Sequence, residues 1–204
     1  SDSRIRVRIP VIASINCNTP HEWTYFAKKI ESAGADALEL NIFILPSEQA
    51  QSAESIESTY LKIIQTVRQE VRVPIAVKMS HYFSNLAGMI AGLSRCNIEG
   101  LVLFNRSYNP DIDTENLKVT SAGVFSSPKD ISLSLRWIAI MANRVKCDLA
   151  ASTGIHSGEA VVKQLLAGAR VAQVVSAIYE KGPEHIGTMT GDLKSWMETK
   201  GYSR

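Results

Sequence analysis

The stretch that decides the fold reads Asp148-Leu-Ala-Ala-Ser-Thr-Gly-Ile-His-Ser-Gly-Glu159 and continues as Gln164-Leu-Leu-Ala-Gly-Ala-Arg-Val-Ala-Gln-Val-Val-Ser-Ala177. It is typical of a strand, a small polar turn, a helix, a second strand and a second small polar turn. In a parallel α/β fold, both turns follow the carboxyl ends of adjacent strands. We therefore expect the two turns at the same edge of one sheet.

The residue types in these turns favour a bound phosphate. We expect the backbone N–H groups of Ser152, Thr153 and Gly154 to converge on one phosphate with those of Val175 and Ser176. Glycine lets the backbone approach a ligand closely, and helix N-termini behind such turns favour anions. In a (β/α)8 barrel the loops after the last two strands commonly hold a phosphate. The sequence therefore predicts a phosphorylated ligand.

The rest of the chain repeats the alternation of strand and helix. Thr19-Pro20-His21-Glu22 forms a capping box with proline at the first helical position, and Gly34 ends the helix that follows. Residues 106–126 are polar and without periodicity, which predicts a long irregular loop of functional importance. Strands are expected at 10–15, 37–41, 74–78, 100–105, 148–151 and 171–175, the first of them buried, and helices at 20–33, 60–71, 86–93, 127–145, 158–168 and 183–196.

Six strands that alternate with helices predict a parallel sheet. We predict an α/β fold, a TIM (β/α)8 barrel of which residues 1–204 form a single partial domain. A complete barrel takes about 250 residues, so two of its eight units are missing from this chain. Because a six-strand piece would leave open sheet edges, we expect the missing part to exist in the native protein.

Composition excludes several classes of partner. A net charge of +2 gives no reason to expect nucleic acid. No apolar run approaches the about 18 residues that span a membrane. Three cysteines, Cys17, Cys96 and Cys147, lack the spacing of a metal site, so we expect no metal and free thiols in a reducing cytoplasm.

Six short motifs occur in order at the predicted strand ends: Pro10-Val-Ile-Ala-Ser-Ile15, Glu39-Leu-Asn-Ile42, Pro74-Ile-Ala-Val-Lys-Met79, Phe104-Asn105, Ser152-Thr-Gly-Ile155 and Gln173-Val-Val-Ser-Ala177. Together they resemble the dihydroorotate dehydrogenase family of flavin-dependent (β/α)8 barrels. The resemblance covers nearly the whole chain, from the third strand of the family's barrel to just after its eighth. It also implies a homodimer and a role in pyrimidine metabolism.

The resemblance implies that FMN is the cofactor. Its phosphate would lie on Ser152, Thr153, Gly154, Val175 and Ser176, the residues already singled out for a phosphate. Lys78 would face the flavin ring near N1 and O2, where a cation stabilises the reduced flavin anion. The plainer interpretation of Lys78 is a strand-end lysine whose amine reaches solvent.

Further contacts to the cofactor or substrate follow from the same resemblance. Ser14, Asn41 and Asn105 would hydrogen-bond the flavin ring or a planar substrate stacked on it, since an asparagine offers both a donor and an acceptor. Both asparagines could instead simply cap loops. Gly123 falls near glycines of the family that let the backbone reach the cofactor.

The chain departs from the family where the chemistry takes place. The family's catalytic base, a Cys or Ser after the fourth barrel strand, corresponds to Ile44, and a substrate-binding asparagine corresponds to Pro46. Arg106 replaces a small hydroxyl residue. His81 is the one plausible replacement base near the fifth barrel strand, although a structural role is the default for a lone histidine. His156 could reach a phosphate, but a solvated loop position is its simpler interpretation.

Two classes of function follow. The first is a dihydroorotate dehydrogenase-like, FMN-dependent oxidoreductase that acts on a CH–CH group of a small planar substrate without the usual base. The second is a barrel that binds a phosphorylated ligand or a flavin and has no redox turnover. A flavin absorbance spectrum of the purified protein separates a flavoprotein from a plain phosphate binder.

Overall fold

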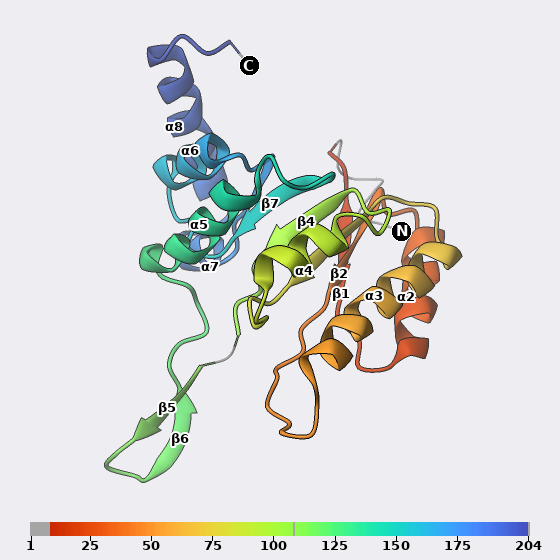
Figure 1. Cartoon of the computed structure of the whole chain (residues 1–204). Helices are drawn as coiled ribbons and strands as arrows, with labels where there is room; N and C mark the ends of the chain where they lie inside the picture. Colours follow the sequence, from red (N-terminus) through yellow and green to blue (C-terminus); the bar gives the residue numbers. More distant parts are fainter. Residues whose placement is uncertain (1–8, 108, 204) are drawn as a thin grey trace. The chain divides into compact units, whose positions relative to one another are not determined.

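The structure, a computed structural model, describes residues 9–107 and 109–203 (Figure 1). The chain divides into two compact units. Unit 1 holds the residues up to Asn105 together with Asn143–Leu149, and unit 2 holds Arg106–Ala142 and the residues from Ala150 onward. The expectation of one partial barrel domain stays a prediction, and each unit is described by itself.

Unit 1 alternates strands and helices as the sequence predicts. The pairs β1–β2, β2–β3 and β3–β4 are all parallel. The capping box forms, with Thr19 and Glu22 as its members, and Gly34 has a φ of +86° just after the helix. The elements are β1 (Ile12–Ile15), α2 (Pro20–Ser32), β2 (Ala37–Asn41), α3 (Ala53–Glu70), β3 (Ile75–Met79), α4 (Leu86–Leu93) and β4 (Gly100–Leu103).

The core of unit 1 lies on one face of these strands. Side chains alternate between the two faces of a strand, so every second residue of β2, β3 and β4 enters the core. The residues of this face that are 0% exposed are Leu38, Leu40, Ile75, Val77, Met79, Leu101 and Leu103. Helix α3 adds Tyr60, Ile64 and Val67, which recur at helical spacing. The polar residues of β2 and β3 are thereby left to the opposite face.

Strand β1 is not the buried strand that its apolar sequence predicts. Ile12 is 58% exposed, and the exposure of β1 alternates along its length. Among the described residues, β1 lies at the edge of the sheet with β2 as its one neighbour. An apolar run predicts a buried strand only where other elements pack on both faces of the sheet. A strand at the edge of the sheet is packed less completely.

Unit 2 carries the end of the parallel sheet. Among the described residues the sheet has the strand order β1-β2-β3-β4-β7-β8, and β7 pairs with β8 in parallel. Strand β7 begins in unit 1, with Asp148 and Leu149, and ends in unit 2. The elements are β5 (Pro110–Asp113), β6 (Lys118–Ser121), the 3-10 turn η1 (Pro128–Asp130), α5 (Ile131–Met141), β7 (Asp148–Ser152), α6 (Gly158–Ala167), β8 (Val171–Gln173), α7 (Ser176–Lys181) and α8 (His185–Thr199).

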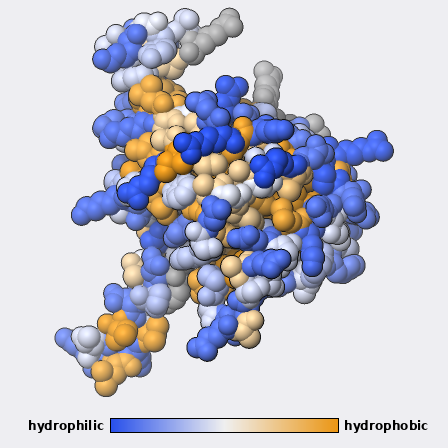
Figure 2. Space-filling view, viewed as in Figure 1, coloured by the Kyte–Doolittle hydropathy of each residue, from blue (hydrophilic) through white to orange (hydrophobic). Residues whose placement is uncertain are grey.

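The segment expected to be an irregular loop contains a β-hairpin. Strands β5 and β6 pair antiparallel, with Ile112 opposite Val119, and the Asp113 carboxylate accepts hydrogen bonds from two N–H groups of the turn. Ile112 and Val119 are 66% and 73% exposed. In Figure 2 the hairpin shows orange, hydrophobic residues at the surface. Four-residue strands rich in Asp and Thr carry too little hydrophobic periodicity for a sequence prediction.

The predicted last helix, 183–196, is present as α8, and a short helix that the sequence does not predict, α7, precedes it. Helix α7 ends at Lys181, and α8 begins at His185. Gly182, with a φ of +83°, and Pro183 separate them. The three cysteines are free, as expected, and no described helix is long and apolar enough to cross a membrane.

Candidate functional site

Register brings the polar residues of unit 1 together on the face opposite its core. Ser14 pairs with Glu39 across β1 and β2, and Asn41 pairs with Lys78 across β2 and β3. The Ser14 hydroxyl donates to Oε1 of Glu39 at 2.7 Å. Glu39 is only 5% exposed, so this face holds a buried carboxylate one strand away from a lysine.

Lys78 is a half-buried lysine with a perturbed amine. Burial lowers the pKa of Lys78, while the negative charge of Glu39 acts in the opposite direction and raises it. Burial is the larger cause, because desolvation penalises the charged form of an amine. The amine of Lys78 thus lies in a half-buried environment beside a carboxylate.

The two asparagines that the sequence predicts at the site differ in their hydrogen-bond partners. The Oδ1 atom of Asn41 is buried and has no hydrogen-bond partner among the described residues. Asn105 donates its Nδ2 to the carbonyl of Ile42 at 3.1 Å, and the Tyr60 hydroxyl donates to the same carbonyl at 3.1 Å. Asn105 thus fixes the chain just after β2, whereas Asn41 presents an acceptor that lacks a donor.

His81 lies among aromatic rings. Its ring centroid is 4.4 Å from that of Tyr82 and 5.9 Å from that of Phe104. Burial lowers the pKa of His81, which favours the neutral imidazole. Its Nδ1 is buried with no hydrogen-bond partner among the described residues. A neutral imidazole is the form that accepts a proton, although the lowered pKa makes His81 a weaker base.

The loop that carries Ile44 and Pro46 is apolar, and it borders a cavity of about 290 Å³. Its walls include Pro46, the aromatic rings of Tyr82 and Phe83, and one carboxylate, Glu57. The loop thus supplies no proton acceptor at the base position. The departure from the family at Ile44 and Pro46 stays a prediction from the sequence.

In unit 2, one serine joins the two turns that the sequence assigns to a phosphate. Gly154 donates its N–H to Oγ of Ser126 at 3.3 Å. Ser126 donates its own N–H to Oγ of Ser176 at 2.9 Å, and the two hydroxyls are 3.0 Å apart. The turns after β7 and β8 therefore come within hydrogen-bonding reach of a single side chain. Ser126 was missed because it ends the segment read as an irregular loop.

His156 belongs to the same cluster, and its assignment to a solvated loop is wrong. It is 6% exposed, with Nε2 3.2 Å from Oγ of Ser126. Its Nδ1 is 3.5 Å from Oε2 of Glu180, and its backbone oxygen contacts Nε2 of His185 at 2.9 Å. No sequence signal links these residues, because they lie 24 to 30 positions apart on separate elements.

Gly154 is constrained by packing as well as by its backbone angle. Its φ is +77°, and a Cβ placed there would lie 2.2 Å from the backbone nitrogen of Ile131, at the start of α5. Glycine is therefore required whether or not a ligand binds. Thr153, the residue before it, also has a positive φ, of +78°.

Arg106 and Gly123 hold the loop that leads to Ser126. Nη1 of Arg106 donates to the carbonyls of Gly123 and Val124 at 3.0 and 2.9 Å. Gly123 has a φ of +112° and no atom within 4 Å of a would-be Cβ. The arginine that replaces a small hydroxyl residue of the family thus stabilises backbone.

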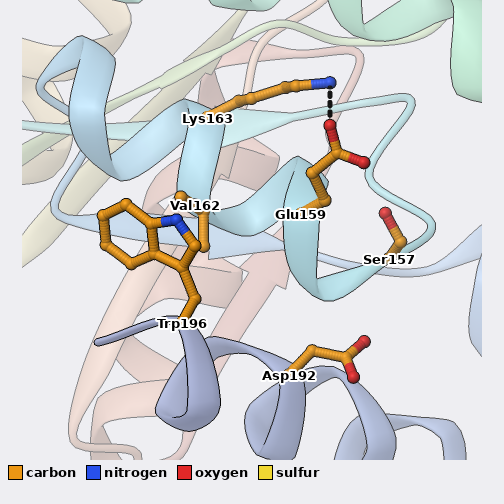
Figure 3. A pocket seen from close by; sticks show the side chains of 6 residues that line it. All are labelled: Ser157, Glu159, Val162, Lys163, Asp192 and Trp196. Atoms are coloured by element: carbon orange, nitrogen blue, oxygen red, sulfur yellow. Dashed lines mark ion pairs between the residues drawn. The ribbon is translucent and has the colours of Figure 1, made fainter. Parts of the chain in front are cut away.

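A larger pocket of unit 2, of about 560 Å³, lies between α6 and α8 (Figure 3). Trp196 and Asp192 come from α8, while Glu159, Val162 and Lys163 come from α6. Lys163 and Glu159 pair at 2.7 Å, as the dashed line in Figure 3 marks. Helix side chains line most of this pocket, and Ser157, the N-cap of α6 at the end of the turn after β7, completes its lining.

A comparison with known protein families identifies the family of this chain. The family model for dihydroorotate dehydrogenase matches residues 1–197. The chain belongs to the dihydroorotate dehydrogenase family. A solved structure of DHODH from Eimeria tenella in complex with ferulenol has a similar fold, with a TM-score of 0.70, 18% sequence identity, and coverage of 91% of this chain and 56% of that one.

Curated members of the dihydroorotate dehydrogenase family match nearly the whole chain at low identity. The putative dihydroorotate dehydrogenase A (fumarate) of Aeropyrum pernix is 26% identical over 202 residues, which cover 95% of this chain and 64% of the relative. The catalytic subunit of dihydroorotate dehydrogenase B (NAD(+)) of Methanothermobacter thermautotrophicus is 28% identical over 204 residues, which cover 96% and 66%. The chain thus spans just under two thirds of the length of these relatives.

The opposing effects of burial and Glu39 on Lys78 can be separated. Glu39→Gln keeps an acceptor for Ser14 but removes the negative charge, so the pKa of Lys78 should fall further below its ordinary value. Titration of the lysine amine by NMR measures this, with Glu57→Gln as a control for a carboxylate elsewhere in unit 1. A pKa of Lys78 that rises, or stays unchanged, in Glu39→Gln would contradict the assigned electrostatics.

The packing requirement at Gly154 predicts a loss of stability without any ligand. Gly154→Ala should lower the free energy of unfolding by at least about 2 kcal/mol, because it combines a positive φ with a backbone clash. Gly123→Ala, which has a positive φ and open space, should cost about 1 kcal/mol. Urea denaturation measures both. Equal losses in the two variants would show that the start of α5 yields to the methyl group.

Proposed function

We propose that this protein is an FMN-dependent oxidoreductase of the dihydroorotate dehydrogenase family that lacks the family's usual base. It would act on a CH–CH group of a small planar substrate. The observation that carries the proposal is the pairing of Asn41 with Lys78 on a polar sheet face, where the buried Oδ1 of Asn41 has no donor in the part of the chain that the structure describes. We also propose that the parallel strands correspond to the third to eighth strands of the (β/α)8 barrel, and that the protein forms a cytoplasmic homodimer.

The residues of unit 1 fit the ring of FMN. A flavin ring carries an N–H donor beside carbonyl acceptors, which suits the unpartnered Oδ1 of Asn41 and the amine of Lys78. FMN would supply a hydride acceptor. Lys78 would hold positive charge beside the ring, and the half-buried environment would strengthen that interaction.

The residues of unit 2 fit the phosphate of FMN. Two turns already share Ser126 as a hydrogen-bond partner, and this serine stands where a phosphate oxygen could accept the N–H of Gly154. The hydroxyls of Ser126 and Ser176 are further donors for a phosphate. This fit supports FMN and equally supports the second candidate function, a barrel that binds the cofactor without redox turnover.

Isoleucine at the position of the family's base, Ile44, predicts slow oxidation of the substrate. Oxidation of a CH–CH group requires a base that takes one proton while hydride leaves for the flavin. Ile44 cannot accept a proton, and the weak base His81 lies in the turn that follows β3. The substrate of this protein would therefore carry a more acidic C–H group than dihydroorotate, or the protein would turn over slowly.

Flavin binding is the first test. Purified protein mixed with FMN should show the shifted absorbance spectrum of a bound flavin, and Lys78→Ala should weaken binding about tenfold through loss of a charge-assisted contact. Lys62→Ala, on the exposed side of α3, should bind like the unmodified protein. Equal affinities in all three proteins would remove Lys78 from the ring contacts, and a protein that never binds FMN would overturn the proposed function.

Turnover is the second test. In an anaerobic stopped-flow experiment, dihydroorotate should bleach the bound flavin about 10²–10⁴ times more slowly than an enzyme with a positioned base would. His81→Asn should reduce the remaining rate further if His81 accepts the proton. Fast bleaching that His81→Asn leaves unchanged would contradict the proposed loss of the base. Reduction by another planar dihydro compound would keep the oxidoreductase and change its substrate.

A further inference from the structure

We infer that Glu180, His156 and Ser126 form a hydrogen-bonded relay that makes unit 2 select a phosphorylated flavin over an unphosphorylated one. The inference rests on the proposed function, because it concerns the phosphate of the same cofactor. Ser126 is the central residue, because it contacts both turns through Gly154 and Ser176. His156 and Glu180 lie behind it, so they are positioning residues.

The spacing of the relay fixes the roles of the two imidazole nitrogens. Nδ1 of His156 lies 3.5 Å from a Glu180 carboxylate oxygen, and Nε2 lies 3.2 Å from Oγ of Ser126. A carboxylate accepts hydrogen bonds and does not donate them when ionised, so Nδ1 carries the proton. The other nitrogen therefore faces Ser126, and Glu180 holds the ring in that orientation.

Hydrogen counting at Ser126 explains why the orientation matters. A hydroxyl has one hydrogen and two lone pairs, and Ser126 meets three polar partners, namely Gly154, Ser176 and His156. Ser126 accepts the N–H of Gly154 and donates its own hydrogen to Oγ of Ser176 at 3.0 Å. Nε2 of His156 holds Ser126 in that orientation, so the hydrogen of Ser176 is the one that would reach a phosphate oxygen.

Burial increases the strength of the relay. Ser126 and His156 are each 6% exposed, so their hydrogen bonds compete little with water. Glu180 is 43% exposed and can reach the imidazole from the surface without a large desolvation cost. The phosphate would thus receive a hydrogen bond from an oriented, partly buried serine hydroxyl, in addition to those from backbone N–H groups of the turns.

Riboflavin provides the internal control, since it shares the ring of FMN and lacks the phosphate. We expect the intact protein to bind FMN more tightly than riboflavin, as measured by isothermal titration calorimetry. His156→Ala should lower the affinity for FMN about tenfold or more and leave that for riboflavin unchanged, because it removes the buried hydrogen-bond partner that orients Ser126. His156→Gln, which keeps a donor near Ser126, should recover part of the loss.

Glu180→Gln tests the relay without disturbing a buried position. It should lower the preference for FMN in the same direction as His156→Ala, while Glu184→Gln, an exposed neighbour on the chain, should leave it unchanged. A preference for FMN that survives both His156→Ala and Glu180→Gln would overturn the relay and keep the proposed function. Equal losses for FMN and riboflavin would overturn the relay as a phosphate device. Failure of the intact protein to bind either flavin would overturn the proposed function and the relay together.

Discussion

The side-chain period of two along β2 and β3 is the constraint on which unit 1 depends. Leu38, Leu40, Ile75 and Val77 are 0% exposed in the core, so the residues between them point to the opposite face. Charged and amide groups, Lys78 and Asn41 among them, collect on the other face as a geometric consequence. A shift of one residue in the register would bury the lysine among helices and remove the core at the same time.

That constraint also explains why the polar face can hold perturbed groups at all. A lysine in a half-buried environment is costly, and the nearby carboxylate of Glu39 offsets part of the cost. Perturbed titratable groups cluster at binding sites, which makes this face of the sheet the candidate site of unit 1.

Local signals made much of the fold predictable from the sequence. The capping box at Thr19, the positive φ of Gly34 and the alternation of strands with helices all depend on neighbouring residues. The hairpin of β5 and β6 was missed because short polar strands leave a weak pattern. The exposure of Ile12 depends on whether other elements pack against the edge strand. The apolar sequence of the strand does not show whether such elements are present.

In the candidate site, too, some residues follow from the sequence and others only from tertiary contacts. The residues at strand ends, such as Asn41 and Lys78, follow from topology, since parallel strands end at one edge. Ser126 and His156 could not be found in this way, because their contact joins a loop, a turn and a helix that are distant in sequence. Only the tertiary structure reveals that a histidine in a small polar turn is buried and oriented by a carboxylate.

The packing of Gly154 against α5 affects how motifs of this kind are interpreted across related proteins. A glycine that the fold itself requires would persist in a descendant that no longer bound any phosphate, because its replacement would harm folding first. The presence of such a glycine therefore indicates the fold and not a bound ligand. A polar side chain such as His156 is not required by the backbone, so it can be substituted once its ligand is lost. Its presence is therefore the better indication of what the protein still binds.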